Sequence, residues 1–387
     1  MKYGSLLFAF MTVLSLVITI NSNFDLIASR LVLSVIDNDK GDRSNSKSDN
    51  SINNKLGFSI YSVELAYAQI NDTSIPNTSI NNSMHFYTNA VDMPTARSEA
   101  AATNIGARIY VIGGAPGALD IVEIYDVATD TWISSKNDGP SSVAPLPVGV
   151  NHAAAASYDG KLYVIGGFLE GRVASGYLFT YDPIENAWSR GADMPTPRAA
   201  LTANFINGTL YAVGGTNEDA SALDIVEAYN PSNNTWTTNI DQMPTARQHL
   251  SSAVVDGKLY VIGGRISGPS TNLNSTERFD PRLGNWTILD DMLSRRSGLA
   301  AAAIEDNIYV FGGESSNHIF DNNEKYSTRT GNWTSQIPLP TPCHGLGAAV
   351  IDNDIYLIGG GLEAGRSSPA TTVVEIYHTN GTAALMT

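Results

Sequence analysis

The strongest constraint on the fold is a short apolar segment that begins with Tyr, ends in two glycines and occurs six times. Repetition at a period of about fifty residues is typical of propeller blades, because each copy is one supersecondary unit that needs its neighbours to bury a core. No helical pattern or Lys-Ser/Thr follows the glycines, so we predict a structural turn role for them rather than a phosphate site. The pairs are Gly113–Gly114, Gly166–Gly167, Gly214–Gly215, Gly263–Gly264, Gly312–Gly313 and Gly359–Gly360.

Three further segments recur in a constant order around each glycine pair. A turn of the form Met-Pro-Thr-x-Arg precedes the pair, as in Met93–Arg97 and Met243–Arg247, and a strand such as Glu227-Ala-Tyr229 follows it. A tryptophan strand ends five of the six units, at Trp132, Trp188, Trp236, Trp286 and Trp333. Each unit thus holds four segments of strand length.

This order of motifs resembles the kelch repeat from about Met84 to His378. The resemblance implies an all-β fold, a six-bladed β-propeller of four-stranded antiparallel blades. We predict the propeller at residues 84–380, with residues 84–92 as a closing strand. The predicted blade units are residues 93–138, 139–193, 194–242, 243–291, 292–338 and 339–380.

Side-chain size predicts which strand lies where in a blade. Runs of small residues, such as Ala300–Ala303, fit the inner strands, where converging blades leave least room. We predict that the tryptophans lie further out and wedge between blades. The last unit lacks a tryptophan, and Phe86 precedes Met93 by the interval that separates Trp236 from Met243, so we predict that the N-terminal segment supplies the missing outer strand.

Charge and cysteine content exclude several classes of partner and site. The chain has 23 Lys and Arg against 38 Asp and Glu, a formal net charge of −15, and no dense basic run. We therefore predict no nucleic-acid partner. The single cysteine, Cys343, excludes an internal disulfide framework and a cysteine-based zinc site.

The N-terminal residues predict export. Lys2 precedes the apolar run from Leu6 to Ile20, which fits a secretory signal and is marginally long enough for a membrane anchor. We predict a signal peptide or anchor at residues 1–22, a disordered polar linker at 23–83, a short tail at 381–387, and a secreted or membrane-tethered protein at the cell surface. Glycosylation is a hypothesis that rests on sequons at Asn71, Asn77, Asn81, Asn207, Asn233, Asn274, Asn285, Asn332 and Asn380.

The residue that enters each inner strand is an arginine in four units. Arg97, Arg198, Arg247 and Arg296 share this position, which Val150 and Cys343 occupy in the other two units. We predict that the arginines ring one mouth of the central channel, where they could bind a carboxylate or phosphate. The alternative is that each pairs with a glutamate of a neighbouring blade.

Histidines form a second pattern near the same mouth. His152 and His249 occupy equivalent positions, and His344 lies one position earlier in its unit. This offset turns His344 to the opposite side of its strand, so we predict no metal site and no cofactor. Asn151, His152, His249 and His344 are instead candidates for ligand binding.

Two functions compete on this evidence. The first is a binding module that holds a protein, an acidic glycan or an acidic peptide at one mouth and through the variable loops after the glycine pairs. The second is an enzyme similar to the sialate epimerases among kelch propellers, for which Glu99 beside Arg97 is a candidate acid/base residue. The copper oxidases of the same superfamily fit less well, because Cys343 has no evident set of copper-ligand partners. We favour the module and assign no catalytic residue.

Overall fold

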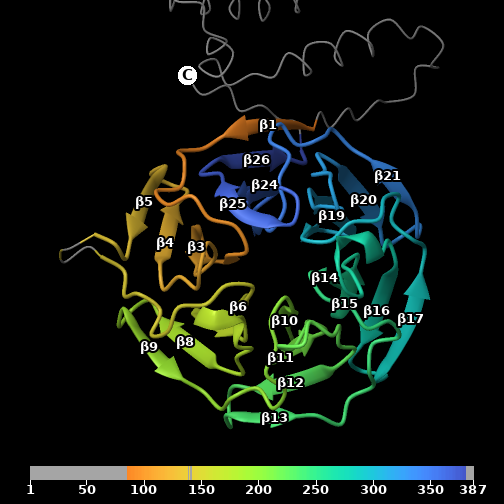
Figure 1. The fold of residues 1–387 in the computed structure, drawn as a ribbon, viewed down its shortest axis with the longest axis horizontal. Coiled ribbons are helices and arrows are strands. Elements are labelled where there is room, and N and C mark those ends of the chain that lie inside the picture. The colour runs from red at the N-terminus through yellow and green to blue at the C-terminus, as the bar shows by residue number, and fades with distance from the viewer. Residues whose placement is uncertain (1–84, 138, 140–141, 381–387) are drawn as a thin grey trace, which may run out of the picture. The chain divides into compact units, whose positions relative to one another are not determined.

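A computed structural model describes residues 85–137, 139 and 142–380. This part of the chain forms six four-stranded antiparallel sheets around a central axis (Figure 1), which confirms the predicted all-β class and the six four-stranded sheets. The predicted export segment, linker and tail, with the sequons at Asn71, Asn77 and Asn81, lie outside the described residues and remain predictions.

Each sheet is one blade, and its strands follow one another from the axis outward. Blade 1 consists of β2 (Ala101–Ile105), β3 (Arg108–Ile112), β4 (Val122–Asp126) and β5 (Thr131–Ser134). Blade 2 consists of β6 (Ala154–Tyr158), β7 (Lys161–Ile165), β8 (Leu178–Asp182) and β9 (Ala187–Arg190). Blade 3 consists of β10 (Thr202–Ile206), β11 (Thr209–Val213), β12 (Val226–Asn230) and β13 (Thr235–Thr237). Blade 4 consists of β14 (Ser251–Val255), β15 (Lys258–Ile262), β16 (Thr276–Asp280) and β17 (Asn285–Leu289). Blade 5 consists of β18 (Ala300–Ile304), β19 (Asn307–Phe311), β20 (Asn323–Ser327) and β21 (Trp333–Ser335).

Blade 6 combines both ends of the described chain. Its inner strands are β22 (Gly347–Ile351), β23 (Asp354–Ile358) and β26 (Val374–His378), and its outermost strand is β1 (Phe86–Asn89). A small hairpin of β24 (Gly361–Glu363) and β25 (Arg366–Ala370) lies between β23 and β26 in the chain. In Figure 1 the orange β1 lies along the outer edge of the dark blue β26, so pairing of the N-terminal strand closes the ring.

The register of β1 differs by one residue from the sequence-based prediction. Each tryptophan lies opposite the aromatic residue of the preceding strand, as Trp236 lies opposite Tyr229, but in blade 6 it is Tyr87 that lies opposite Tyr377. Phe86 was therefore the wrong equivalent, and it stacks on His378 instead, with ring centroids 4.5 Å apart. The connection from Trp236 to Met243 is one residue longer than those that follow Trp188, Trp286 and Trp333, which misaligned the comparison.

The tryptophans tie each outer strand to the chain segment that enters its blade. The indole N–H groups of Trp132, Trp188, Trp236, Trp286 and Trp333 donate to backbone oxygens of these segments at 2.8–3.0 Å. Trp236 also packs against a core that contains Tyr163 of blade 2 and Tyr229 of blade 3, so it lies at a blade boundary. In blade 6 the hydroxyl of Tyr87 replaces the indole N–H and donates to the oxygen of Ile337 at 3.3 Å.

The glycine pairs join each blade to the next. The second glycine donates its N–H to the backbone oxygen of the residue that enters the next inner strand, as Gly167 donates to Arg198 at 3.0 Å. A Cβ on Gly166 would lie only 2.4 Å from that same oxygen. The close approach of two backbones therefore requires glycine at this position.

A closed ring of backbone hydrogen bonds surrounds the axis. One residue per blade has a positive φ of 50–63° and donates its N–H to the oxygen of its counterpart in the adjacent blade at 2.7–2.9 Å. The bond from Glu99 to Gly345 links blade 1 to blade 6 and completes the circle. These six ring positions are Glu99, His152, Ala200, His249, Gly298 and Gly345. The ring fixes the start of every inner strand, and it therefore fixes the residues at one end of the channel.

The helices η2 (Glu170–Arg172) and η3 (Pro269–Thr271) are single 3₁₀ turns. Within the described residues, no helix has the length and apolar character needed to cross a membrane.

Candidate functional site

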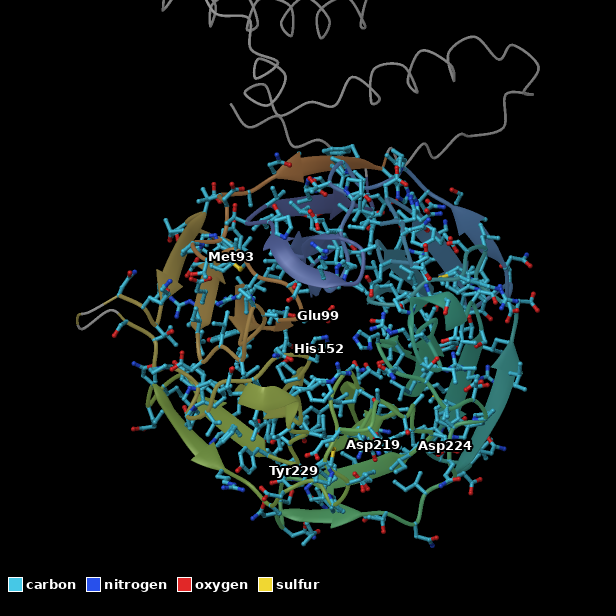
Figure 2. All side chains as sticks on the ribbon, in the orientation of Figure 1. Met93, Glu99, His152, Asp219, Asp224 and Tyr229 are labelled. Atoms are coloured by element: carbon cyan, nitrogen blue, oxygen red, sulfur yellow. The ribbon has the colours of Figure 1, made fainter. Side chains whose placement is uncertain are left out.

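Two adjoining cavities follow the axis of the propeller. The first, of about 440 Å³, is the channel between the inner strands and is lined mainly by small residues. The second, of about 390 Å³, lies at one end of the channel and shares Glu99, His152 and His249 with it. We call this second cavity the mouth pocket. Figure 2 shows Glu99 and His152 beside the central opening.

Three repeated positions supply most of the polar side chains of the mouth pocket. They are the ring position, the residue before it, and the first residue after each glycine pair, and the last two form an antiparallel bridge within each blade. The bridged pairs are Ser98 with Ala115, Asn151 with Phe168, Ala199 with Thr216, Gln248 with Arg265, Ser297 with Glu314, and His344 with Gly361. The backbone repeats at these positions while the side chains differ from blade to blade.

Glu99 is the centre of the side-chain cluster in the mouth pocket. Its Oε2 lies 3.5 Å from Nε2 of His152, and its Oε1 lies 3.4 Å from Nδ1 of His344. The Nδ1 atom of His152 is hydrogen-bonded to the side-chain oxygen of Asn151 at 2.7 Å. The imidazole rings of His152 and His249 are edge to face, with centroids 5.0 Å apart. Residues from blades 1, 2, 4 and 6 therefore meet above the channel.

Arg265 and Glu314 form the opposite wall of the pocket. Arg265 Nη1 lies 2.6 Å from Glu314 Oε1, and its Nη2 donates to Nε2 of His249 at 2.9 Å. Glu314 Oε2 accepts the backbone N–H of Gly365 at 2.5 Å, which connects this wall to the β24–β25 hairpin. The same hairpin holds His344, whose Nε2 lies 2.9 Å from the backbone oxygen of Arg366.

The electrostatics of the cluster separate the three histidines. Burial and the charge of Arg265 lower the pKa of His249 well below its usual value, and burial also lowers the pKa of His152. Burial disfavours the charged form of His344 as well, but hydrogen bonding to Glu99 and the charges of Glu99 and Glu314 raise its pKa to about 9. Burial would raise the pKa of Glu99, but the surrounding imidazoles outweigh it and hold that pKa below the usual range. The pocket therefore contains an ionised carboxylate beside one charged and two neutral imidazoles at neutral pH.

The structure brings together only part of the predicted site. Asn151, His152, His249 and His344 all line the mouth pocket. The prediction that His344 faces away was wrong, because this residue precedes β22 and the alternation of a regular strand does not apply to it. The next residue, Gly345, has a φ of 58° and turns the chain, so His344 reaches Glu99.

The predicted ring of arginines at the mouth was also wrong. Arg97, Arg198, Arg247 and Arg296 are at most 1% exposed and lie inside their blades. Each pairs with a glutamate of its own blade, in the pairs Arg97 with Glu123, Arg198 with Glu227, Arg247 with Glu277, and Arg296 with Glu324. The apolar part of the blade surrounds these pairs, which explains why the arginines do not reach the channel.

Blade 6 keeps the glutamate of this pair but has no arginine at the paired position. Glu375 is 4% exposed, and the arginine position is occupied by the buried Cys343. Burial raises the pKa of Glu375 to about 7, since no cationic partner lies beside it among the described residues, although hydrogen bonds from Thr341 oppose the shift. The folded protein therefore binds a proton at Glu375 under conditions in which the unfolded chain, with a pKa near 4.5, has released it.

We predict that Glu375→Gln removes a pH dependence from the stability of the protein. Stability contributed by the protonated carboxyl is fully present below about pH 4.5 and is lost as the pH rises through about 7. Relative to Glu375→Gln, the wild-type protein should therefore lose about 3 kcal/mol between pH 4.5 and pH 8. Urea unfolding of both proteins across this range measures the difference, and parallel pH profiles would contradict the prediction.

Glu99, Arg265 and Glu314 are three of the pocket residues that the sequence did not single out for ligand binding. Glu99 drew attention only as an acid/base candidate beside Arg97, and Arg265 and Glu314 only as the first residues of variable loops. The sequence contains a pattern that could have identified these residues. The residues directly after the glycine pairs differ in every unit and include both charges, whereas the strand and the glycine pair before them repeat.

Comparisons with known proteins agree with the fold. Residues 190–360 match the model of the KLHDC2/KLHL20/DRC7 Kelch-repeats domain, and residues 77–264 match that of the Attractin/LZTR1 beta-propeller. In the solved structure of YjhT, 96% of the chain superimposes on 74% of this one with a TM-score of 0.63 and 17% identity, which shows the fold alone.

Three similar curated proteins share shorter segments. Beta-scruin of Limulus polyphemus is 31% identical over 30% of this chain and 13% of its own length. Kelch-like protein 36 of Mus musculus is 32% identical over 29% of this chain and 18% of its own. Kelch-like protein terF of Aspergillus terreus is 34% identical over 28% of this chain and 24% of its own. The matched segments thus span less than a quarter of the length of these relatives.

Proposed function

We propose that this chain is a kelch-repeat β-propeller that acts as an exported binding module and holds a protein or glycan partner at the mouth pocket. Kelch propellers are generally protein-binding modules, which supports the general role. The position and chemistry of the binding site come from this chain's own residues.

The observation that carries the proposal is the loss of repetition at one end of the channel. The buried arginine–glutamate pairs, the glycine pairs and the outer aromatic residues recur from blade to blade because they build the ring. At the mouth the same backbone positions present glutamate, histidine, arginine, phenylalanine or no side chain. Variation on a rigid repeated scaffold is typical of a recognition surface.

The rim of the pocket favours a ligand with an acidic group. Arg172 is exposed, has no ion-pair partner among the described residues, and places its guanidinium 5.1 Å from the ring centroid of Phe168. Arg366 lies on the β24–β25 hairpin, where its side chain is 73% exposed and pairs with the exposed Glu363 at 3.4 Å. A guanidinium above an aromatic ring presents donors for a carboxylate next to an apolar face, which suits an acidic sugar or an acidic peptide.

Reversal of the charge at Arg172 tests this proposal. Binding of the full chain to an array of sialylated glycans and acidic peptides should decrease roughly tenfold in Arg172→Glu, because a repulsive carboxylate replaces the guanidinium. Arg329→Glu is the matched control, since Arg329 is exposed in the turn between β20 and β21, away from the mouth pocket. The array signal of Arg329→Glu should equal that of the wild type.

Two outcomes would count against the module. Equal signals for Arg172→Glu and the wild type would place recognition elsewhere on the surface. A sugar that is captured and then released in a chemically altered form, detected by NMR of the eluted ligand, would instead favour the enzymatic alternative.

A further inference from the structure

We propose that Glu99, His152 and His249 form a binding site for one divalent transition-metal ion above the end of the channel. The proposal concerns the residues of the mouth pocket but does not depend on a partner binding there. It assigns metal binding to the three ring positions whose side chains can coordinate a metal ion.

The geometry is that of a site with converging ligands. One ligand atom from each of the three residues lies within 4.8 Å of the other two. A metal ion at about 2.0–2.2 Å from each nitrogen and oxygen would hold its ligand atoms about 3–4 Å apart, so only small side-chain adjustments are needed. The 3.5 Å distance between His152 Nε2 and Glu99 Oε2 already falls within this range.

The neighbours of two ligands orient them as metal ligands are normally oriented. His152 Nδ1 has the side-chain oxygen of Asn151 as its partner at 2.7 Å, so the proton lies on Nδ1 and the lone pair of Nε2 faces Glu99. A lone pair and a carboxylate oxygen that face each other require a cation or a proton between them. His344 lies beside the other oxygen, Oε1, and holds the carboxylate in place.

The remaining ring positions leave room above the axis. They are occupied by Ala200, Gly298 and Gly345, so only the three proposed ligands project long side chains from the ring. A Cβ on Gly345 would lie 2.4 Å from Glu99 Oε1, which shows that glycine there makes space for the carboxylate. The ring of hydrogen bonds fixes the backbone of all three ligands relative to one another.

Arg265 competes with the ion for His249. A neutral imidazole has one lone pair, and in this structure Nε2 uses it to accept the hydrogen bond from Arg265 while Nδ1 is buried without a partner. Arg265 keeps Glu314 and Ser297 as partners when it releases His249. Metal binding therefore exchanges one hydrogen bond for one coordinate bond, and the guanidinium weakens the site without abolishing it.

Two imidazoles and one carboxylate favour zinc and its neighbours over calcium or magnesium, which prefer ligand sets made only of oxygen. Three protein ligands leave at least one coordination position, because such ions take four or more ligands. This position faces the mouth pocket, where water or an oxygen of a ligand can fill it.

The test is a titration of the tag-free full chain, stripped with a chelator, with Zn²⁺ in competition with a chromophoric chelator. We expect one equivalent of bound Zn²⁺ in the wild type, and a loss of at least about 100-fold in affinity in Glu99→Gln and in His152→Gln, since removing a direct ligand should exceed the effect of an outer-shell change. His318→Ala is the control, because His318 is exposed and does not line the mouth pocket, and it should bind like the wild type. Arg265→Met should bind roughly tenfold more tightly, because the competing donor is gone.

Thermal unfolding in chelator establishes that each variant folds, and Co²⁺ added to the wild type gives an independent signal through its visible absorption in a nitrogen and oxygen site. The absence of a stoichiometric site in the wild type would overturn the proposal. Retention of the site in both Glu99→Gln and His152→Gln would overturn it equally, because the ion would then be bound elsewhere. Weaker binding in a folded Arg265→Met would remove His249 from the ligand set.

Discussion

Glu227→Gln is expected to lower the free energy of unfolding by about 3–5 kcal/mol, because it leaves a buried guanidinium without its counter-charge. Arg198 is completely buried and pairs with Glu227 inside blade 3. Its other partners are the backbone oxygens of Thr196 and Ala212, both at 3.0 Å. These neutral acceptors cannot neutralise the charge. Urea unfolding at pH 7 followed by tryptophan fluorescence measures the loss.

Blade 2 shows how the same position can be filled without charges. Val150 occupies the arginine position and Phe179 the glutamate position, and both are buried. The double substitution Arg198→Val with Glu227→Phe copies this apolar pair into blade 3. Because well-packed apolar residues can replace a buried ion pair at little net cost, the double variant should recover most of the stability that Glu227→Gln loses.

A surface pair supplies the control for this experiment. Arg190 and Asp193 form an ion pair 2.7 Å apart at about half exposure, so Asp193→Asn should change the stability by less than about 1 kcal/mol. If Glu227→Gln behaved like Asp193→Asn, the buried pairs would not hold the blades together in the way that their burial indicates.

The repeat was enough to predict the strands of the propeller because a blade is set by local pattern. An apolar run that ends at Gly263 and Gly264 predicts a buried strand followed by a tight turn, and the same pattern occurs six times. The equivalent of the outer tryptophan in blade 6 was misassigned because a single inserted residue between Trp236 and Met243 shifts the comparison by one position. The register of the closing strand depends on its pairing with β26 at the other end of the described chain, and a local sequence pattern does not predict such a pairing.

The candidate site was less accessible from the sequence. Pairing of the arginines with glutamates of a neighbouring blade was the alternative prediction, but Arg247 pairs with Glu277 of its own blade, and the burial of this pair follows from packing inside the blade. The contact between Glu99 and His344 joins residues from opposite ends of the propeller sequence, and it depends on closure of the ring. Convergence of this kind is a property of the assembled scaffold rather than of any one repeat.

Deletion of residues 84–92 is expected to destabilise the propeller by about 4 kcal/mol or more, because the deletion removes the outermost strand of blade 6. Tyr87 packs on the core that blades 5 and 6 share, and its ring lies 5.0 Å from that of Tyr377. Truncation of a packed aromatic side chain alone typically costs about 3–5 kcal/mol. The thermal midpoint of the deletion variant should fall by roughly 8 °C, at about 2 °C per kcal/mol for a domain of this size.

Point substitutions in β1 separate the contribution of side-chain packing from the effect of removing the whole strand. Tyr87→Ala should reproduce most of the destabilisation, since it removes both the aromatic contact and the hydrogen bond to Ile337. Asn89→Ala is the matched control in the same strand, because Asn89 is exposed and its substitution should change the stability by no more than about 0.5 kcal/mol. Equal midpoints for Tyr87→Ala and Asn89→Ala would mean that β1 does not close the ring.

The deletion also exposes the backbone of β26 as an open sheet edge. In the intact protein the register from Phe86 with His378 to Asn89 with Glu375 covers this edge. An uncovered edge presents unpaired N–H and C=O groups to other molecules, so the variant should form dimers or larger species that light scattering detects as protein concentration rises. Tyr87→Ala keeps the backbone of β1 and should remain in the wild-type oligomeric state. Closure by the N-terminal strand therefore serves two separable purposes: its side chains stabilise blade 6, and its backbone prevents association of the ring through an open edge.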